Sequence, residues 1–327
     1  MTIAIIGAGL AGLSAAHELV RQGKSVRLFD KGRGPGGRMS TRRAQTELGE
    51  LRWDHGAQYF TARDSRFREV VEDLVAKGAA AIWEGRFVSL STDGEASPLS
   101  PEVRFVGAPG MNAIIKALGE GFNVAWGKRV ERISGSAGHW TLDFEDGGKE
   151  GPFDAVVSAV PAEQVPALLE DVAPDIAKEA SSVVSAPCWA LMLAFSEPID
   201  PGFDAARRDG GPIAWLARNS SKPGRDDGET WVVHASPDWS RDHLEDTADA
   251  VAGRLAEAFR HLTGAPEPSY AAAHRWRYSQ VETTAATPAI WDASLTLGVC
   301  GDWRIAPRVE AAWTSGLALA ELICNPE

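Results

Sequence analysis

Apolar residues follow two different spacings at the start of the chain. Residues 2–6 (TIAII) and 25–30 (SVRLFD) are short runs rich in β-branched and other apolar residues, which are typical of buried strands in a parallel sheet. Between them, apolar residues recur at helical spacing from Leu10 to Val20, and Gly23 ends the pattern. The chain therefore begins with a predicted strand–helix–strand unit.

Glycines mark the junction between the first predicted strand and the helix. Gly7, Gly9 and Gly12 have the spacing G-x-G-x-x-G. The first glycine allows a tight turn, the second lets backbone approach a pyrophosphate, and the third lets the helix pack closely on the strand. The helix N-terminus attracts phosphates, and Asp30 at the end of the second strand can accept hydrogen bonds from an adenosine ribose. Together these features predict dinucleotide binding.

A basic, glycine-rich segment follows. Residues 30–43 (DKGRGPGGRMSTRR) hold five cations and four glycines, in a chain whose formal net charge is −12. Gly36-Gly37-Arg38 allows backbone to approach a ligand and then supplies a cation, as a second wall around a pyrophosphate requires. A solvated basic loop is the alternative. We interpret the segment as facing phosphates.

The composition narrows the class of protein. The chain has 327 residues, 44% of them hydrophobic and 24% charged, with a pI near 5.1. An acidic chain is a poor match for nucleic acid or an anionic membrane, which bind basic faces. Its three cysteines and seven histidines show no metal-ligand spacing. The glycine-interrupted N-terminal run predicts neither a signal peptide nor a membrane span, so we expect a cytoplasmic protein. The lack of metal-ligand spacing predicts that the protein holds no metal.

The rest of the chain predicts further strands and one terminal helix. Short strand patterns occur at 123–133, 139–145 and 153–160, the last two separated by the turn-forming sequence DGGKEG. Residues 219–229 (NSSKPGRDDGE) are the most loop-like stretch and a candidate for mobility. Residues 294–302 predict a strand ending in Asp302, and a helix is predicted to follow from Val309. Such an element places an acid next to the positive end of a helix, where the two can bind ligand hydroxyls and stabilise negative charge.

Several blocks of sequence resemble one family. Residues 7–19 and 30–43 resemble the FAD-binding start of the flavin-containing amine oxidase superfamily. Five further blocks resemble its renalase-like branch: WDHGAQYFTARD (53–64), GMNAIIKAL (110–118), APCWALMLAF (186–195), RWRYSQV (275–281) and CGDWRIAPRVEAAWTSG (300–316). The resemblance spans the whole chain and is looser between about 196 and 270.

This resemblance implies an α/β fold, with an FAD-binding Rossmann-like domain and a smaller α+β substrate domain, as in p-hydroxybenzoate hydroxylase and the amine oxidases. It places residues 1–76, 103–165 and 294–327 in the FAD-binding domain, and 77–102 and 166–293 in the substrate domain. It implies non-covalent FAD, because neither Cys300 nor Cys324 lies in a tethering motif. The implied cofactor-binding residues are Gly7, Gly9, Leu10, Ala11, Gly12, Asp30, Lys31, Gly37, Arg38, Met39, Gly56, Ala57, Gln58, Val130, Asp302 and Val309.

The resemblance also implies a substrate. Renalase-like enzymes oxidise wrongly reduced NAD(P)H isomers, such as the 1,2-dihydro form, to NAD(P)⁺ and pass the electrons to O₂ to give hydrogen peroxide. We expect Tyr59, Trp276 and Tyr278 to form aromatic walls for the dihydropyridine ring. No acid/base pair or nucleophile motif is evident, so no catalytic residue is predicted. A hydride that leaves easily needs mainly positioning.

Three other functions are compatible with the residues alone. An amine oxidase would need an acidic or aromatic cage for a cation. A desaturase of large apolar substrates would need a long apolar channel or a membrane-facing surface, and no such segment is evident. A flavin-bearing redox sensor without turnover is the third alternative.

Overall fold

A six-stranded sheet forms the centre of one half of the molecule. The computed structural model describes residues 1–225 and 228–325. The strand order is β19 (Ile290–Asp292), β20 (Leu297–Val299), β13 (Ala155–Ser158), β1 (Thr2–Ile6), β2 (Ser25–Asp30) and β9 (Val124–Trp126). All neighbouring pairs are parallel except β19 with β20. The mixed α/β fold expected from the sequence is confirmed.

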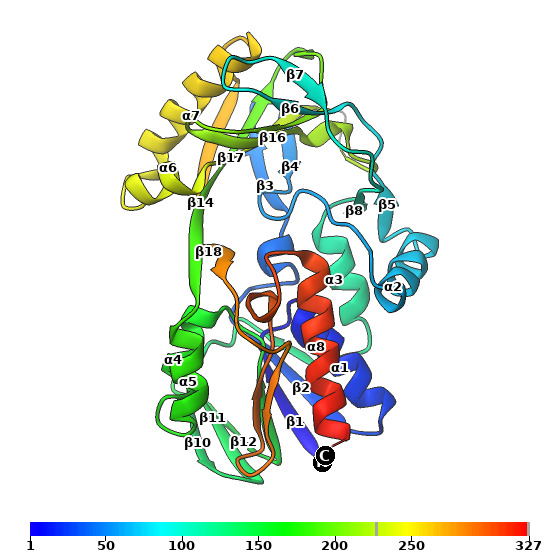
Figure 1. Cartoon of the computed structure of the whole chain (residues 1–327), viewed down its shortest axis with the longest axis vertical. Helices are drawn as coiled ribbons and strands as arrows, with labels where there is room; N and C mark the ends of the chain where they lie inside the picture. Colours follow the sequence, from blue (N-terminus) through cyan, green and yellow to red (C-terminus); the bar gives the residue numbers. More distant parts are fainter. Residues whose placement is uncertain (226–227, 326–327) are drawn as a thin grey trace.

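The two faces of this sheet are covered by different layers (Figure 1). In β1, Ile3 and Ile5 pack towards α1 (Leu10–Arg21) and α8 (Val309–Cys324), while the alternate residues Ala4 and Ile6 face the opposite layer. That layer holds the antiparallel sheet β10 (Val130–Ser136), β11 (His139–Phe144) and β12 (Lys149–Phe153), with α4 (Val165–Leu169) and α5 (Pro174–Ser181). Burial on both faces explains the uninterrupted apolar run of β1.

The first βαβ unit has the bounds that the sequence predicts, and its glycines explain how tightly it packs. A Cβ added to Gly12 would lie 2.0 Å from the Gly7 carbonyl oxygen, and one added to Gly316 of α8 would lie 2.1 Å from the Ala11 oxygen. Only glycine allows these backbone approaches. They fix the N-terminus of α1 beside the end of β1.

A seven-stranded sheet dominates the other half. Its strand order is β18 (Tyr270–Thr283), β14 (Val184–Phe195), β17 (Glu229–Ala235), β16 (Ile213–Arg218), β15 (Ala205–Arg208), β6 (Phe87–Leu90) and β7 (Ala96–Pro98). Figure 1 shows α6 (Pro237–Asp242) and α7 (Ala248–Thr263) on its outer side. The hairpin β3 (Arg42–Thr46)–β4 (Gly49–Trp53) packs on the inner face, where the Trp53 indole N–H donates to the Leu193 carbonyl at 2.8 Å.

The remaining elements join the two halves. Strands β5 (Ala80–Ile82) and β8 (Phe105–Gly107) pair with each other, next to α2 (Ser65–Ala76) and α3 (Asn112–Gly119). None of the helices in the described part of the chain is long and apolar enough to cross a membrane.

The arrangement of several strands and helices differs from the expected organisation. The third strand of the small antiparallel sheet is β12, whose first residues were expected to belong to a turn, and residues 155–158 instead enter the six-stranded sheet as β13. Helices α4 and α5 share a core with β10 and β11, and β19 joins the six-stranded sheet. The expected division into two domains, with boundaries near residues 165 and 293, stays a prediction.

Candidate cofactor and substrate cavity

A cavity of about 540 Å³ lies between the two halves. One side is built from the loop after β1, the segment around Arg38 and the residues from Gly301 to Ala312. The other side is formed by side chains from the inner face of the seven-stranded sheet. Such a cleft between two layers is the usual place for a cofactor and its substrate.

Most of the predicted site residues line this cavity. The cofactor candidates in the lining are Gly9, Leu10, Ala11, Arg38, Met39, Gly56, Ala57, Gln58, Asp302 and Val309, and the substrate candidates are Tyr59 and Trp276. The others lie outside the lining: Gly7, Gly12, Asp30, Lys31, Gly37, Val130 and Tyr278. Gly7 and Gly12 shape the turn, Val130 is buried in β10, and Lys31 donates to Gln164 at 2.8 Å. Tyr278 is 37% exposed. The roles of all these residues stay predictions.

The turn after β1 has the donor set that a diphosphate needs. Helix α1 starts after Gly9 without a capping side chain, and a Cβ on Gly9 would meet nothing within 4 Å. The first N–H groups of the helix are thus open to the cavity at Gly9, Leu10 and Ala11. Asp30 holds the adjoining backbone, because its two carboxylate oxygens accept from Ala8 N and Gly32 N, each at 2.7 Å. Each oxygen keeps a second lone pair that can accept from a ribose hydroxyl.

The glycine-rich basic segment forms a second backbone wall. Gly37 has φ +54°, and a Cβ on Gly36 would lie 2.7 Å from the Ser40 Cα. Gly56 approaches so closely that a Cβ there would lie 2.0 Å from the Arg38 carbonyl oxygen, which also accepts from Ala57 N at 2.9 Å. Backbone from two distant segments is therefore layered directly beside the cavity.

Arg38 and Asp302 form a two-pronged ion pair inside this wall. Arg38 Nη1 lies 2.8 Å from Asp302 Oδ2, and Nη2 lies 2.5 Å from Oδ1. The pair joins the basic segment to the element before α8, as expected if both contribute to one binding site. Bidentate geometry of this kind is among the stronger ionic contacts.

Aromatic rings form the side of the cavity that belongs to the seven-stranded sheet. The centroids of Tyr59 and Trp215 are 5.5 Å apart. Trp276 donates from its indole nitrogen to the His55 carbonyl at 3.0 Å and stacks on the His55 ring at 5.1 Å. These contacts fix the Trp276 ring in one orientation.

Two histidines next to these rings are held neutral. Burial lowers the pKa of His55 to about 3 and that of His234 to about 4. His234, which the sequence did not identify, lines the cavity beside Trp215, because these two residues are cross-strand partners in β16 and β17. At neutral pH neither imidazole is a cation, so these two residues add no positive charge to the wall.

Comparisons with known proteins agree with this architecture. A family model described as "NAD(P)-binding Rossmann-like domain" matches residues 5–74, and one described as "Flavin containing amine oxidoreductase" matches residues 81–324. A structure from Exiguobacterium sp. 255-15, whose proposed role is protoporphyrinogen oxidase, has a TM-score of 0.78 at 12% identity and covers 99% of this chain and 98% of its own. Two further similar structures are putrescine oxidase variants redesigned in cofactor binding. One has a TM-score of 0.72 at 12% identity and the other a TM-score of 0.73 at 13% identity. Each match covers 99% of this chain, together with 100% of the first variant and 99% of the second.

The purified protein should release its FAD on denaturation. Burial raises the pKa of the Cys300 thiol to about 12, so this cysteine next to the cavity stays protonated and is a poor nucleophile for a flavin. Heat or acid should move all of the yellow colour into the supernatant, measured by absorbance and by mass spectrometry of the free cofactor. Flavin left on the denatured chain, or FMN in place of FAD, would contradict this prediction.

Arg38→Ala should weaken FAD binding. It removes a charge-assisted contact worth about 1.5–3 kcal/mol, which is roughly a ten- to hundredfold rise in the dissociation constant. Arg33→Ala is the matched control, because Arg33 lies in the same segment but is exposed and outside the cavity lining. Titration of the apoproteins with FAD measures both constants. Equal effects of the two substitutions would contradict the placement of Arg38 at the cofactor.

Proposed function

The chain belongs to the family of flavin containing amine oxidoreductases, whose model matches residues 81–324, and on this premise we propose that it is an FAD-dependent oxidase of misreduced NAD(P)H isomers. The proposed substrate class is a dihydropyridine dinucleotide such as 1,2-dihydro-NAD(P), as in the renalase-like branch. Bound FAD would supply the acceptor for the hydride and would pass both electrons to O₂, yielding hydrogen peroxide.

The observation that carries this proposal is the state of the carboxylates around the cavity. Each carboxylate in the lining already has a partner. Asp302 is paired with Arg38, Glu102 lies 3.5 Å from Arg63, and Glu310 accepts from the backbone N–H groups of Arg63 and Asp64. Among the described residues of the lining, a cationic amine would therefore find no carboxylate without a partner. A flat, uncharged ring would find the aromatic walls instead.

Cations in the lining support a substrate that carries phosphates. Arg207 and Arg308 line the cavity in addition to Arg38 and Arg63, which are paired with Asp302 and Glu102. Arg207 of β15 is the cross-strand partner of Trp215, so both side chains project from the same face of the sheet. In a protein with a net charge of −12, such a local group of arginines favours an anionic ligand.

The proposed reaction requires little acid or base catalysis from the protein side chains. A dihydropyridine becomes aromatic when it loses a hydride, so no proton has to be removed from it. The neutral His234 and the paired carboxylates fit that requirement, because no ionised base faces the rings. Tyr59, Trp215 and Trp276 would orient the substrate ring and exclude water, and orientation of this kind can supply a large part of a rate enhancement.

An amine oxidase is the second candidate function. Two of the similar structures are putrescine oxidase variants, and the electron-rich faces of aromatic rings attract cations. Bleaching of the flavin on anaerobic mixing with amines, and not with dihydropyridines, would favour this candidate.

The protein should distinguish isomers of the same dinucleotide. Both isomers carry identical phosphates, so selectivity has to come from the pose of the ring between Tyr59, Trp215 and Trp276. A misplacement of about 1 Å can cost ~100-fold in rate, and we expect anaerobic flavin reduction by the 1,2-dihydro form to be faster than by the 1,4 form by at least about that factor.

Trp276→Ala should narrow this gap by loosening the pose. Trp239→Ala is the control, since Trp239 lies on α6 outside the cavity lining. Stopped-flow absorbance measures the reduction rates. Comparable rates with the two isomers in the unmutated protein would overturn the proposed substrate and leave a general flavin oxidoreductase.

Arg207→Ala should raise the KM for the dinucleotide. The side chain is exposed, so we expect a modest effect of roughly two- to fivefold at low salt, with kcat unchanged. The corresponding dihydronicotinamide riboside, which has no phosphate, should be unaffected. Arg208→Ala is the matched control, because successive residues of β15 point to opposite faces. An equal loss with the riboside, or with Arg208→Ala, would contradict a phosphate contact at Arg207.

A further inference from the structure

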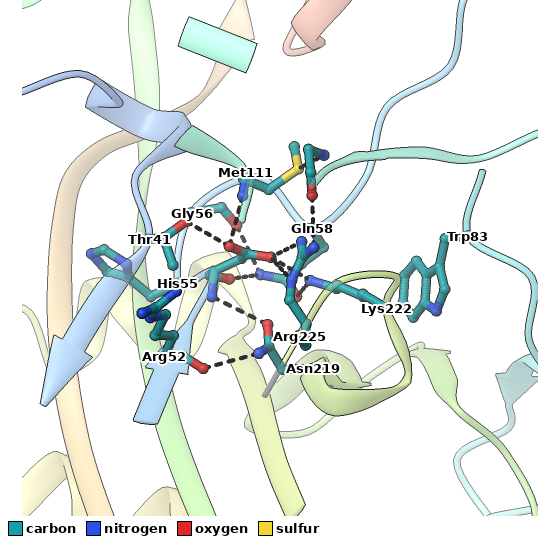
Figure 2. A network of polar contacts seen from close by, with 12 residues as sticks. Thr41, Arg52, His55, Gly56, Gln58, Trp83, Met111, Asn219, Lys222 and Arg225 are labelled. Carbon is teal, nitrogen blue, oxygen red and sulfur yellow. Dashed lines mark hydrogen bonds and ion pairs between the residues drawn. The ribbon is translucent and has the colours of Figure 1, made fainter. Parts of the chain in front are cut away.

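Behind the cavity wall lies a cluster of buried charges, shown in Figure 2. Asp54 follows β4, and Lys222 and Arg225 lie in the loop between β16 and β17. The side chains of Asp54 and Lys222 are 0% exposed and that of Arg225 is 2% exposed. Arg225 Nη2 lies 2.5 Å and Lys222 Nζ 3.4 Å from Asp54 Oδ2. Two cations from the loop between β16 and β17 thus hold the carboxylate that follows the β3–β4 hairpin.

Lys222 has a second acceptor, and this one belongs to the cavity wall. Its Nζ lies 3.1 Å from Gln58 Oε1, and Gln58 lines the cavity together with Gly56. An ammonium group can only donate hydrogen bonds, so Gln58 must present its amide oxygen to Lys222. The amide NH₂ group then points the other way, where it donates to the carbonyls of Asp54 and Gly56, the latter at 3.0 Å.

The orientation of Gln58 matters to its neighbours in the wall. Its amide nitrogen bridges two carbonyls of the segment that runs from Asp54 to Gly56, and it lies 3.4 Å from His234 Nε2. If the amide were reversed, its oxygen would face these carbonyls and the contacts would become repulsive. The two carbonyls and the Lys222 ammonium group therefore favour the same orientation of the amide.

We propose that Lys222 is a positioning residue, whose ammonium group orients the Gln58 amide and so holds the Gly56–Gln58 wall in the shape that binds FAD. Lys222 acts through Gln58 and does not line the cavity itself. The proposal rests on FAD occupying this cavity and not on the dihydropyridine substrate proposed above.

The proposal has a pH signature. Burial lowers the pKa of Lys222 to about 8, although Asp54 opposes this shift. Among the described residues, the charged or titratable groups that face Lys222 are Asp54, Arg225 and His234, and the Trp83 ring lies 5.3 Å from its nitrogen. Arg225 stays charged, Asp54 has a lowered pKa and His234 is neutral, so Lys222 is the group that changes charge near pH 8. Above this pH the neutral amine is a weaker donor to Gln58 Oε1, so it holds the amide less firmly than the ammonium group does.

The test is the FAD dissociation constant measured on both sides of pH 8, by recovery of flavin fluorescence, without any substrate. In the unmutated protein we expect the FAD dissociation constant to rise roughly three- to tenfold as the pH passes through about 8. This factor corresponds to the loss of one hydrogen-bonded contact. Lys222→Met should have the high value at every pH. Lys222→Arg, which stays charged, should keep the low value on both sides. Lys128→Met, which removes an exposed lysine paired with Asp146, should behave as the unmutated protein.

Gln58→Leu separates positioning from a merely structural role. It keeps the contact of Lys222 with Asp54 but removes the amide, so the step near pH 8 should disappear although Lys222 still titrates. A step that survives in Gln58→Leu or in Lys222→Met would overturn the proposal. If Lys222→Met does not fold, Gln58→Leu and Lys222→Arg decide the question alone. Because no substrate is used, failure here leaves the proposed oxidase activity untouched, and failure of that activity leaves this result standing.

Discussion

The burial of one carboxylate, that of Asp54, is the constraint on which the arrangement of the cavity depends. A fully buried charge is costly unless it is paired and hydrogen-bonded. Asp54 Oδ1 accepts from Thr41 Oγ1 at 2.8 Å and from Met111 N at 2.9 Å, and Oδ2 faces Lys222 and Arg225. Burial alone would raise its pKa, but the two cations outweigh burial and the pKa is lowered.

Satisfying this carboxylate brings four distant segments to one point. They are the end of the basic segment, the strand before the Gly56 wall, the start of α3, and the loop after β16. Loss of one partner of a buried ion pair typically costs about 3–5 kcal/mol. Two of these segments, the basic segment and the strand before Gly56, continue into residues that line the cavity, so the contacts that neutralise Asp54 also hold these parts of the wall together.

The parts of this site that depend on local spacing could be predicted from the sequence. The Gly7-Gly9-Gly12 turn and Asp30 act within one βαβ unit, so their spacing alone defines their geometry. Lys222 could not be found in this way, because its partner Asp54 is 168 residues away. A proline- and glycine-containing loop with several charges normally faces solvent, and residues 219–229 were expected to be a mobile loop for that reason. Asn219 and Lys222 are instead buried, while Asp226 and Asp227 lie outside the described residues.

On the substrate side of the cavity, too, the sequence predicts only part of the arrangement. Alternation in a strand predicts which residues share a face, but not how far along the strand a cavity extends. Trp276 and Tyr278 share a face of β18, yet Trp276 lines the cavity and Tyr278 is exposed. Register irregularities in the pairing of β14 with β18, on both sides of Ser185 and Ala186, cannot be read from the sequence. Trp215 and His234 come together only through the register of β16 with β17.

The charges and the aromatic rings around the cavity together favour one kind of ligand. Some charges at the cavity are cancelled in pairs, as in Arg38 with Asp302, and burial keeps the imidazoles of His55 and His234 neutral. What remains open to a ligand is a set of backbone N–H groups at α1, a few arginines, and aromatic rings. Backbone donors and arginines suit phosphates, whereas uncharged rings suit a group that gives up a hydride without first losing a proton. An enzyme that had to deprotonate an ammonium substrate would need a base at these rings. Among the described residues of the lining, each carboxylate has a partner, and the lowered pKa of His234, about 4, makes its imidazole a weak base.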